Sequence, residues 1–180
     1  MTRRKMMLMT AGATVLGLAA LVGFADHNAI LAGDDDEGQE ALIKTLGDAK
    51  INLQRGLAAA AQEGQPISAK FEVDDGKFQL SVYTVKDGKF FELLVDYADG
   101  KVTKSEPITK SDDLTAANSQ RAAIVTATTS LKDAVDKAVA ASANLRAVSV
   151  VPDLKYDGHP VASIVLLDRE QFKTVQRPLD

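Results

Sequence analysis

The chain has 180 residues, 46% of them hydrophobic and 26% charged, and its 21 Lys and Arg against 25 Asp and Glu give a formal net charge of −4. This composition is typical of a globular protein and excludes wholesale disorder, collagen-like repeats and a coiled-coil rod. The absence of cysteine excludes disulfides, cysteine-ligated metal centres and a cysteine nucleophile. With only two histidines, His27 and His159, and no basic stripe, the composition argues against most enzymes and against nucleic-acid binding.

The first 25 residues have the pattern of a secretory signal. A positive segment (residues 3–5) precedes an uncharged apolar run (residues 6–25). Gly23 and Ala25 are small residues suited to a cleavage site, so we expect cleavage after Ala25, with Ala32 as a later alternative. The other interpretation is an uncleaved membrane anchor, because about 20 apolar residues can just span a bilayer. Both interpretations place the remaining chain in the periplasm or outside the cell, and removal of the signal leaves 18 basic and 25 acidic residues, a net charge of −7.

An acidic spacer and a helix follow the predicted signal. Residues 26–40 include the run GDDDEG, which lacks the glycine and glutamate positions of a calcium loop and therefore predicts a solvated spacer. From Glu40 onward, apolar residues recur at steps of three and four, which is typical of a helix with one buried face. Gly47 marks a break between a lead-in turn and a main helix from about Asp48 to Gln62.

Three Asp-Gly pairs, spaced by twelve residues, separate runs in which polar and apolar residues alternate. The pairs are Asp75-Gly76, Asp87-Gly88 and Asp99-Gly100, and the runs are Ile67–Val73, Phe78–Val82, Phe91–Val95 and a last one that begins at Val102. Asp-Gly is a strong hairpin signal because a type I′ turn needs a positive φ at both of its central residues. The pattern predicts an antiparallel meander over residues 67–103.

The second half of the chain repeats this order. We interpret the polar residues 106–123 as a linker and expect a second helix from about Thr115 or Ser130 to Ala143, with Ser130 as a helix N-cap. The expected strands and turns are Ala147–Val151, Asp157-Gly158, Val161–Leu167, Asp168–Glu170 and Phe172–Gln176. The order predicts an α+β fold with an internal duplication, in which residues 41–105 and 124–180 each form one helix packed on an antiparallel meander of three to four strands.

The first of these units resembles the PepSY domain. The helix Ile51-Asn-Leu53-x-x-Gly56-Leu57-x-x-Ala60 is followed by Ile67-x-Ala-x-Phe-Glu-Val, and residues 95–102 (VDYADGKV) match the closing signature of that family. The second unit fits less well, because residues 177–180 stand where the closing signature belongs. The resemblance implies a small α+β domain of exported bacterial proteins with a role in inhibiting or regulating peptidases.

Candidates for chemistry have simpler structural explanations. His159 lies in a turn beside glycine and proline, and Ser130 and Lys132 are two residues apart on a helix, so their side chains point in different directions. Turn formation explains the aspartates Asp74, Asp75, Asp87, Asp99 and Asp157. We therefore expect no catalytic, cofactor or metal site, and no enzymatic activity.

One face of the predicted first sheet carries more apolar side chains than solvent exposure requires. If the alternating core residues face the helix, then Tyr83, Val85, Phe90 and Leu94 lie on the opposite face. Such a cluster is typical of an interface, so we predict that these four residues contact a partner. The alternative is that the second unit covers them within one larger core.

Two functions are consistent with the sequence. The first is an exported, non-catalytic interaction module that binds an envelope protein, for which the resemblance suggests a peptidase, through the outer face and edges of the first sheet. The second is an envelope protein that binds a small ligand or a cation through its acidic surface. Neither function involves nucleic acid, or a membrane once the signal is removed.

Overall fold

The computed structural model of the protein describes residues 36–74 and 76–180. The helices are α1 (Asp36–Leu46), α2 (Leu53–Ala60), α3 (Ser111–Thr126) and α4 (Leu131–Val139). The strands are β1 (Gln65–Asp74), β2 (Lys77–Lys86), β3 (Lys89–Val95), β4 (Val102–Pro107), β5 (Leu145–Leu154), β6 (Pro160–Asp168) and β7 (Gln171–Pro178). The prediction of an α+β fold is confirmed.

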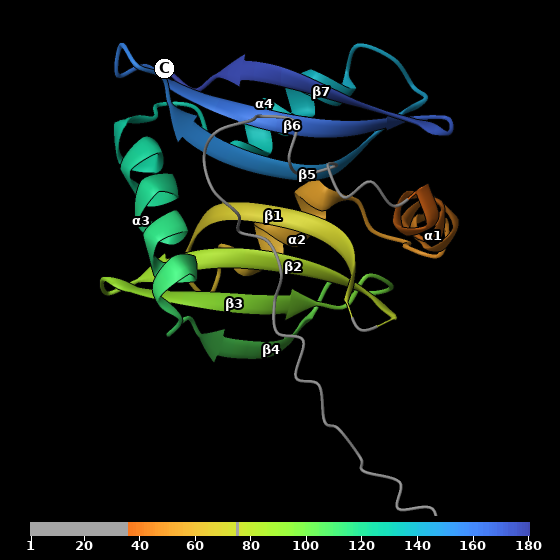
Figure 1. The fold of residues 1–180 in the computed structure, drawn as a ribbon, viewed down its shortest axis with the longest axis horizontal. Coiled ribbons are helices and arrows are strands. Elements are labelled where there is room, and N and C mark those ends of the chain that lie inside the picture. Colours follow the sequence, from red (N-terminus) through yellow and green to blue (C-terminus); the bar gives the residue numbers. More distant parts are fainter. Residues whose placement is uncertain (1–35, 75) are drawn as a thin grey trace, which may run out of the picture.

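All seven strands belong to one antiparallel sheet with the order β4-β3-β2-β1-β5-β6-β7 (Figure 1). Neighbours in sequence pair along both meanders, which confirms the predicted meander over residues 67–103. The meanders meet where β1 pairs with β5, and this seam contains only two residue pairs, Ala69 with Val150 and Lys70 with Ser149. The short ladder means that side chains and helices must supply most of the contact across the seam.

Helices cover both faces of the sheet. α2 packs on β1, β2 and β3, while α4 packs on β5, β6 and β7, and the two helices also contact each other. α3 lies on the opposite face, where it crosses the seam and contacts β1, β5 and β6 (Figure 1). The alternation along the strands assigns the residues to these faces: Leu80 meets α2, so Tyr83 points toward the α3 face.

A side-chain cap sets the start of α2. The Asn52 carboxamide oxygen accepts a hydrogen bond from the Arg55 backbone N–H at 2.9 Å, so the helix begins at Leu53 and not at Asp48 as predicted. Gly56 allows a close approach to the sheet, since a Cβ atom there would lie 2.4 Å from a Leu80 methyl carbon. Close contact between the helix and the sheet therefore explains the glycine at position 56.

The Asp-Gly turns differ in their backbone geometry. Asp87 and Gly88 have φ values of 50° and 75°, which are the two positive angles of a type I′ turn. At Asp99-Gly100 and Asp157-Gly158 only the glycine has a positive φ, so the prediction of type I′ geometry is wrong for Asp99-Gly100. In that turn, Asp96 instead accepts backbone hydrogen bonds from Ala98 and Asp99.

Two helices extend into segments predicted as a spacer and a linker. α1 begins at Asp36, inside the predicted acidic spacer, and replaces the expected lead-in turn. The predicted linker, residues 106–123, contains the end of β4 and most of α3. The second helix is thus two helices, and the start of α4 directly after Ser130 agrees with the predicted N-cap.

No helix within residues 36–74 and 76–180 is long and apolar enough to cross a membrane. The predicted signal segment and its cleavage positions lie outside the described residues.

Candidate functional site

The four predicted partner contacts lie together on the face opposite α2, as the alternation predicts. β2 and β3 place Val85 directly opposite Phe90, and Leu94 lies opposite Ser81 on the same face. However, Tyr83 and Phe90 are only 4% and 6% exposed and belong to the core, so the prediction that they contact a partner at the surface is wrong. Val85 and Leu94 are half-buried.

Helix α3 is the element that was not expected above this face. Its Gln120 side chain accepts a 2.8 Å hydrogen bond from the buried Ser68 hydroxyl on β1. Most of its other buried residues are alanines, which let the helix lie close to the strands. The cover above the seam is therefore a helix from the segment between the meanders, whereas the alternative from the sequence placed the second unit there.

Several buried polar atoms near the contact between α3 and the sheet lack hydrogen-bond partners. Three buried polar atoms, Gln120 Nε2, Ser149 Oγ and Ser163 Oγ, have no hydrogen-bond partner among the described residues. Buried polar groups without partners reduce the stability of an interface. We conclude that α3 is held by close packing and few directional bonds.

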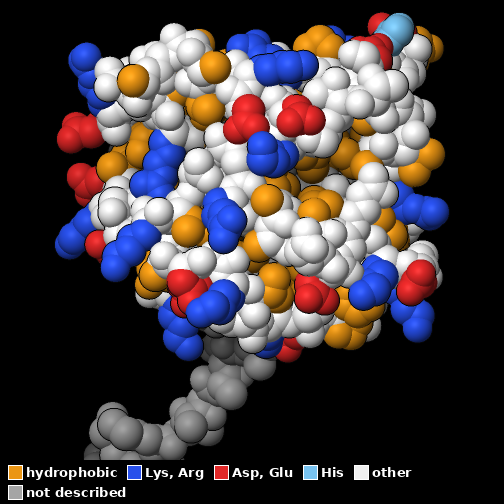
Figure 2. All heavy atoms as spheres, turned by 180° about the vertical axis from the view of Figure 1, so that it is seen from behind, with side chains coloured by type: hydrophobic (Ala, Val, Ile, Leu, Met, Phe, Trp, Pro, Cys, Tyr) orange, Lys and Arg blue, Asp and Glu red, His pale blue; other side chains and the backbone are white. Residues whose placement is uncertain are grey.

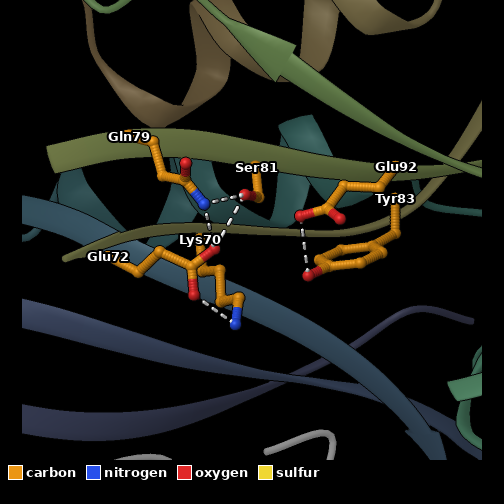
Figure 3. Close-up of polar contacts among 6 residues, drawn as sticks. All are labelled: Lys70, Glu72, Gln79, Ser81, Tyr83 and Glu92. Atoms are coloured by element: carbon orange, nitrogen blue, oxygen red, sulfur yellow. Dashed lines mark hydrogen bonds and ion pairs between the residues drawn. The ribbon is translucent and has the colours of Figure 1, made fainter. Parts of the chain in front are cut away.

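Beside α3 the same face carries six neighbouring polar side chains, which we call the polar cluster (Figure 3). Its members are Lys70 and Glu72 on β1, Gln79, Ser81 and Tyr83 on β2, and Glu92 on β3. Lys70 forms an ion pair of 2.5 Å with Glu72, which also accepts hydrogen bonds from Ser81 at 2.7 Å and Gln79 at 3.3 Å. The Lys70 ammonium lies 6.0 Å from the centre of the Tyr83 ring.

Burial controls the acid–base properties of the cluster. It raises the pKa of Glu92, and the nearby Glu72 carboxylate adds to the effect, whereas the Ser81 and Tyr83 hydroxyls and Lys70 offset part of it. The Tyr83 hydroxyl donates to Glu92 at 3.2 Å, and burial, followed by the charge of Glu92, raises the pKa of this phenol. The cluster thus holds one lysine close to two carboxylates, one of which is partly desolvated.

The raised pKa of Glu92 leads to a prediction about stability and pH. The native state binds a proton on Glu92 more tightly than the unfolded chain does, so this residue stabilises the fold most below its ordinary pKa of 4.5. That contribution is lost as the pH rises through the raised pKa. We therefore expect the free energy of unfolding of Glu92→Gln to rise relative to that of wild type as the pH increases from 4 to 7, as measured by urea unfolding.

A matched substitution controls for general charge effects in that experiment. Glu63→Gln removes an exposed carboxylate from the turn after α2. Its stability difference from wild type should vary less over the same pH range. An unchanging difference for Glu92→Gln would show that the Glu92 carboxylate is as well solvated in the native state as in the unfolded chain.

The other candidates from the sequence remain separate. Asp180 forms a 2.5 Å contact with His159 on the surface and raises the pKa of that histidine. Ser130 caps α4 through the Asp133 N–H, while Lys132 pairs with Asp136. No group of three or more His, Asp or Glu within the described residues could hold a metal ion. The other histidine, His27, lies outside the described residues.

The side of the molecule that carries α2 and α4 has a different surface. Figure 2 shows basic and acidic side chains of that side interspersed with small hydrophobic areas. Among the described residues, the only exposed large hydrophobic side chains are those of Val125 and Tyr156. Mixed surfaces of this kind are typical of solvent contact, so the sheet face with the polar cluster is the stronger candidate site.

Comparison of the chain with protein-family models, curated proteins and solved structures found no match. The candidate site therefore rests on the geometry of this chain alone. Sequence reasoning missed Lys70, Glu72, Gln79, Ser81 and Glu92 as members of it. The only signal in the sequence was the polar positions that alternate with core residues, and alternation alone does not show whether such positions face solvent or form a polar cluster.

Proposed function

We propose that the protein is an exported, non-catalytic binding module built from two PepSY-like units, and that it binds a protein of the cell envelope through the polar cluster face. By this proposal the first unit comprises α2 with β1–β4, and the second comprises α4 with β5–β7. The family resemblance makes a peptidase the first class of partner to test. The predicted signal at residues 1–25 is the basis for export.

Several local features support two related units. Asn52 and Ser130 each cap a helix by accepting from the backbone N–H three residues later. Each helix starts with leucine, and the meander that follows it is antiparallel. The first strand of each meander also has a bulge, between Pro66 and Ser68 in β1 and between Ala147 and Ser149 in β5.

The half-buried polar cluster is the observation that carries the proposed binding function. The side chains of Lys70 and Glu72 are 26% and 21% exposed, so their charged groups remain within reach of a partner. Their mutual bonds fix their positions before binding, which reduces the entropy lost when a complex forms. Leu94 lies opposite Ser81 on the same face and adds apolar area. A face with fixed charges and a partly exposed leucine suits a protein partner better than an isolated cation.

Site-specific cross-linking in the native cells would test this proposal. A photoreactive amino acid at Leu94 or Gln79 is expected to cross-link a discrete protein, because Gln79 belongs to the cluster and Leu94 lies next to it. The same amino acid at Lys137, which is exposed on α4 on the other side of the sheet, serves as the control. Adding Glu72→Gln should reduce the cross-link at Leu94 about tenfold if the ion pair contributes to binding.

The captured protein then identifies the function. A peptidase among the cross-linked proteins should be inhibited by the purified chain and less inhibited by the Glu72→Gln variant. Equal cross-linking at Leu94 and Lys137 would contradict the assignment of the face. Capture of a protein without peptidase activity would support the proposed binding function but show that the partner is not a peptidase.

A further inference from the structure

The two edge strands of the sheet differ in length and in the regularity of their pairing. β4 forms one edge with six residues and carries a register irregularity next to β3. β7 forms the other with eight residues, and its pairing with β6 is regular throughout. No strand of the described part of the chain pairs with the outer side of β7. Long regular edges are the ones that can accept another strand.

The hydrogen-bond pattern shows which groups of β7 point outward. Leu179 N–H donates to Pro160 C=O at 2.9 Å, so these opposite residues form a hydrogen-bonded pair. In an antiparallel ladder such pairs alternate with non-hydrogen-bonded pairs. The backbone N–H and C=O groups of Phe172, Thr174 and Gln176 therefore point away from β6. The Gln176 carbonyl has only a 3.3 Å contact with the neighbouring Arg177 side chain.

The β4 edge offers fewer such groups. Ile108 N–H donates to Phe90 C=O, which by the same alternation directs the backbone of Ser105 and Pro107 outward. Pro107 has no N–H to donate. The irregularity next to β3 involves Thr103, whose hydroxyl bonds to Leu94 C=O. β7 is therefore the edge suited to strand addition.

We propose that β7 pairs with β7 of a second copy of this chain, antiparallel and centred on Thr174, to form a two-fold symmetric dimer. In this register the outward groups of Thr174 bond to their equivalents in the partner, and those of Phe172 bond to those of Gln176. The two sheets then become one continuous sheet. A two-fold axis makes the contact self-complementary and closed.

The charges of β7 select this register over its neighbours. Centring on Thr174 places Lys173 opposite Val175 and Gln171 opposite Arg177. A shift centred on residue 173 would place Lys173 opposite itself, and a shift centred on residue 175 would place it opposite Arg177; like charges directly opposite each other are destabilising. A shift centred on residue 176 would require a donor from Pro178, which has none. The favoured register also forms a Thr–Thr pair, which is stabilising across strands.

Proline substitution tests the two edges independently. In the full chain, Thr174→Pro removes an outward N–H that makes no bond to β6, so the fold should tolerate it. We expect wild type to sediment at twice the chain mass of 19.1 kDa at micromolar concentrations, and Thr174→Pro to weaken the dimer by at least about tenfold. Ser105→Pro makes the same change at the β4 edge and should leave the dimer intact.

Disulfide trapping provides a second measurement that does not depend on proline. The chain has no cysteine, so Thr174→Cys introduces a single thiol. Opposite residues of a hydrogen-bonded pair have Cα atoms about 5.5 Å apart, which a disulfide can bridge. Oxidation should cross-link this variant and not Ser105→Cys. A monomeric wild type, or a dimer that Thr174→Pro leaves unchanged while Thr174→Cys fails to cross-link, would overturn the proposal.

Discussion

Replacing Phe90 with alanine is expected to lower the free energy of unfolding by about 3–5 kcal/mol. The side chain is 6% exposed and belongs to the core cluster that continues toward α3. Its removal deletes most of a buried aromatic ring and leaves a cavity that the sheet can only partly close. The measurement is urea unfolding at neutral pH, followed by circular dichroism.

Two further variants serve as controls for that result. Phe90→Leu keeps most of the volume and should cost less than about 1.5 kcal/mol. Leu94→Ala removes a half-buried side chain on the same face and should cost less than Phe90→Ala. If Phe90→Ala leaves stability unchanged, the ring is exposed in solution, and the original prediction of a partner contact at Phe90 is restored.

The sheet was predictable because its signals are local. Alternation over residues 67–103 and the glycine at each turn specify both the strands and their antiparallel order. The positive φ of Asp87 and Gly88 shows that the sequence also determines the turn type at one hairpin. The pairing of β1 with β5 had no such signal, because it joins segments about 80 residues apart through only two residue pairs.

Helix α3 was predicted only in part, through the start at about Thr115 that the sequence allowed for the second helix. Half of its six buried residues are alanines and the others are Asp113, Gln120 and Ile124, so the face that packs on the sheet is only weakly apolar. The segment between the meanders therefore has the composition of a linker. Its helical structure is stabilised by contact with both meanders, which depends on the assembled sheet.

The polar cluster was missed for a related reason. Ser68, Ser81 and Ser149 alternate with core residues, which is typical of a strand with one solvent-exposed face. In the structure they are buried beneath α3 or among charged side chains. A serine can satisfy either environment, so alternation alone cannot distinguish a solvent face from a polar interface.

These observations change how the surface of the protein is interpreted. The aromatic residues that suggested an interface belong to the core, and the half-buried charges beside them are the groups that we propose contact a partner. The seam between β1 and β5 is bridged on one face by α3. At the end of the sheet where the two strands separate, a single arginine from β5 connects the second meander to the segment between α1 and α2.

Arg146 is that residue, and replacing it with alanine is expected to lower the free energy of unfolding by about 3 kcal/mol. Its guanidinium donates to Leu46 C=O at 2.6 Å, Ala49 C=O at 3.1 Å and Ile51 C=O at 3.3 Å. Leu46 ends α1, where the free carbonyls and the helix dipole favour a cation. The guanidinium also lies 5.6 Å from the centre of the Phe71 ring. Burial lowers the pKa of Arg146, so its charge is retained at a cost that the carbonyl bonds offset.

Conservative and distant variants distinguish this role from general charge effects. Arg146→Lys keeps the charge but cannot reach three carbonyls with a planar fork, so we expect it to recover about half of the loss. Arg146→Met keeps the apolar stem and leaves the carbonyls unbonded, so it should remain close to Arg146→Ala. Arg121→Ala removes an exposed arginine from α3 and should change stability by less than about 0.5 kcal/mol. Equal losses for Arg146→Ala and Arg121→Ala would show that the three carbonyl bonds do not stabilise the fold, and that α1 is attached to the sheet by packing alone.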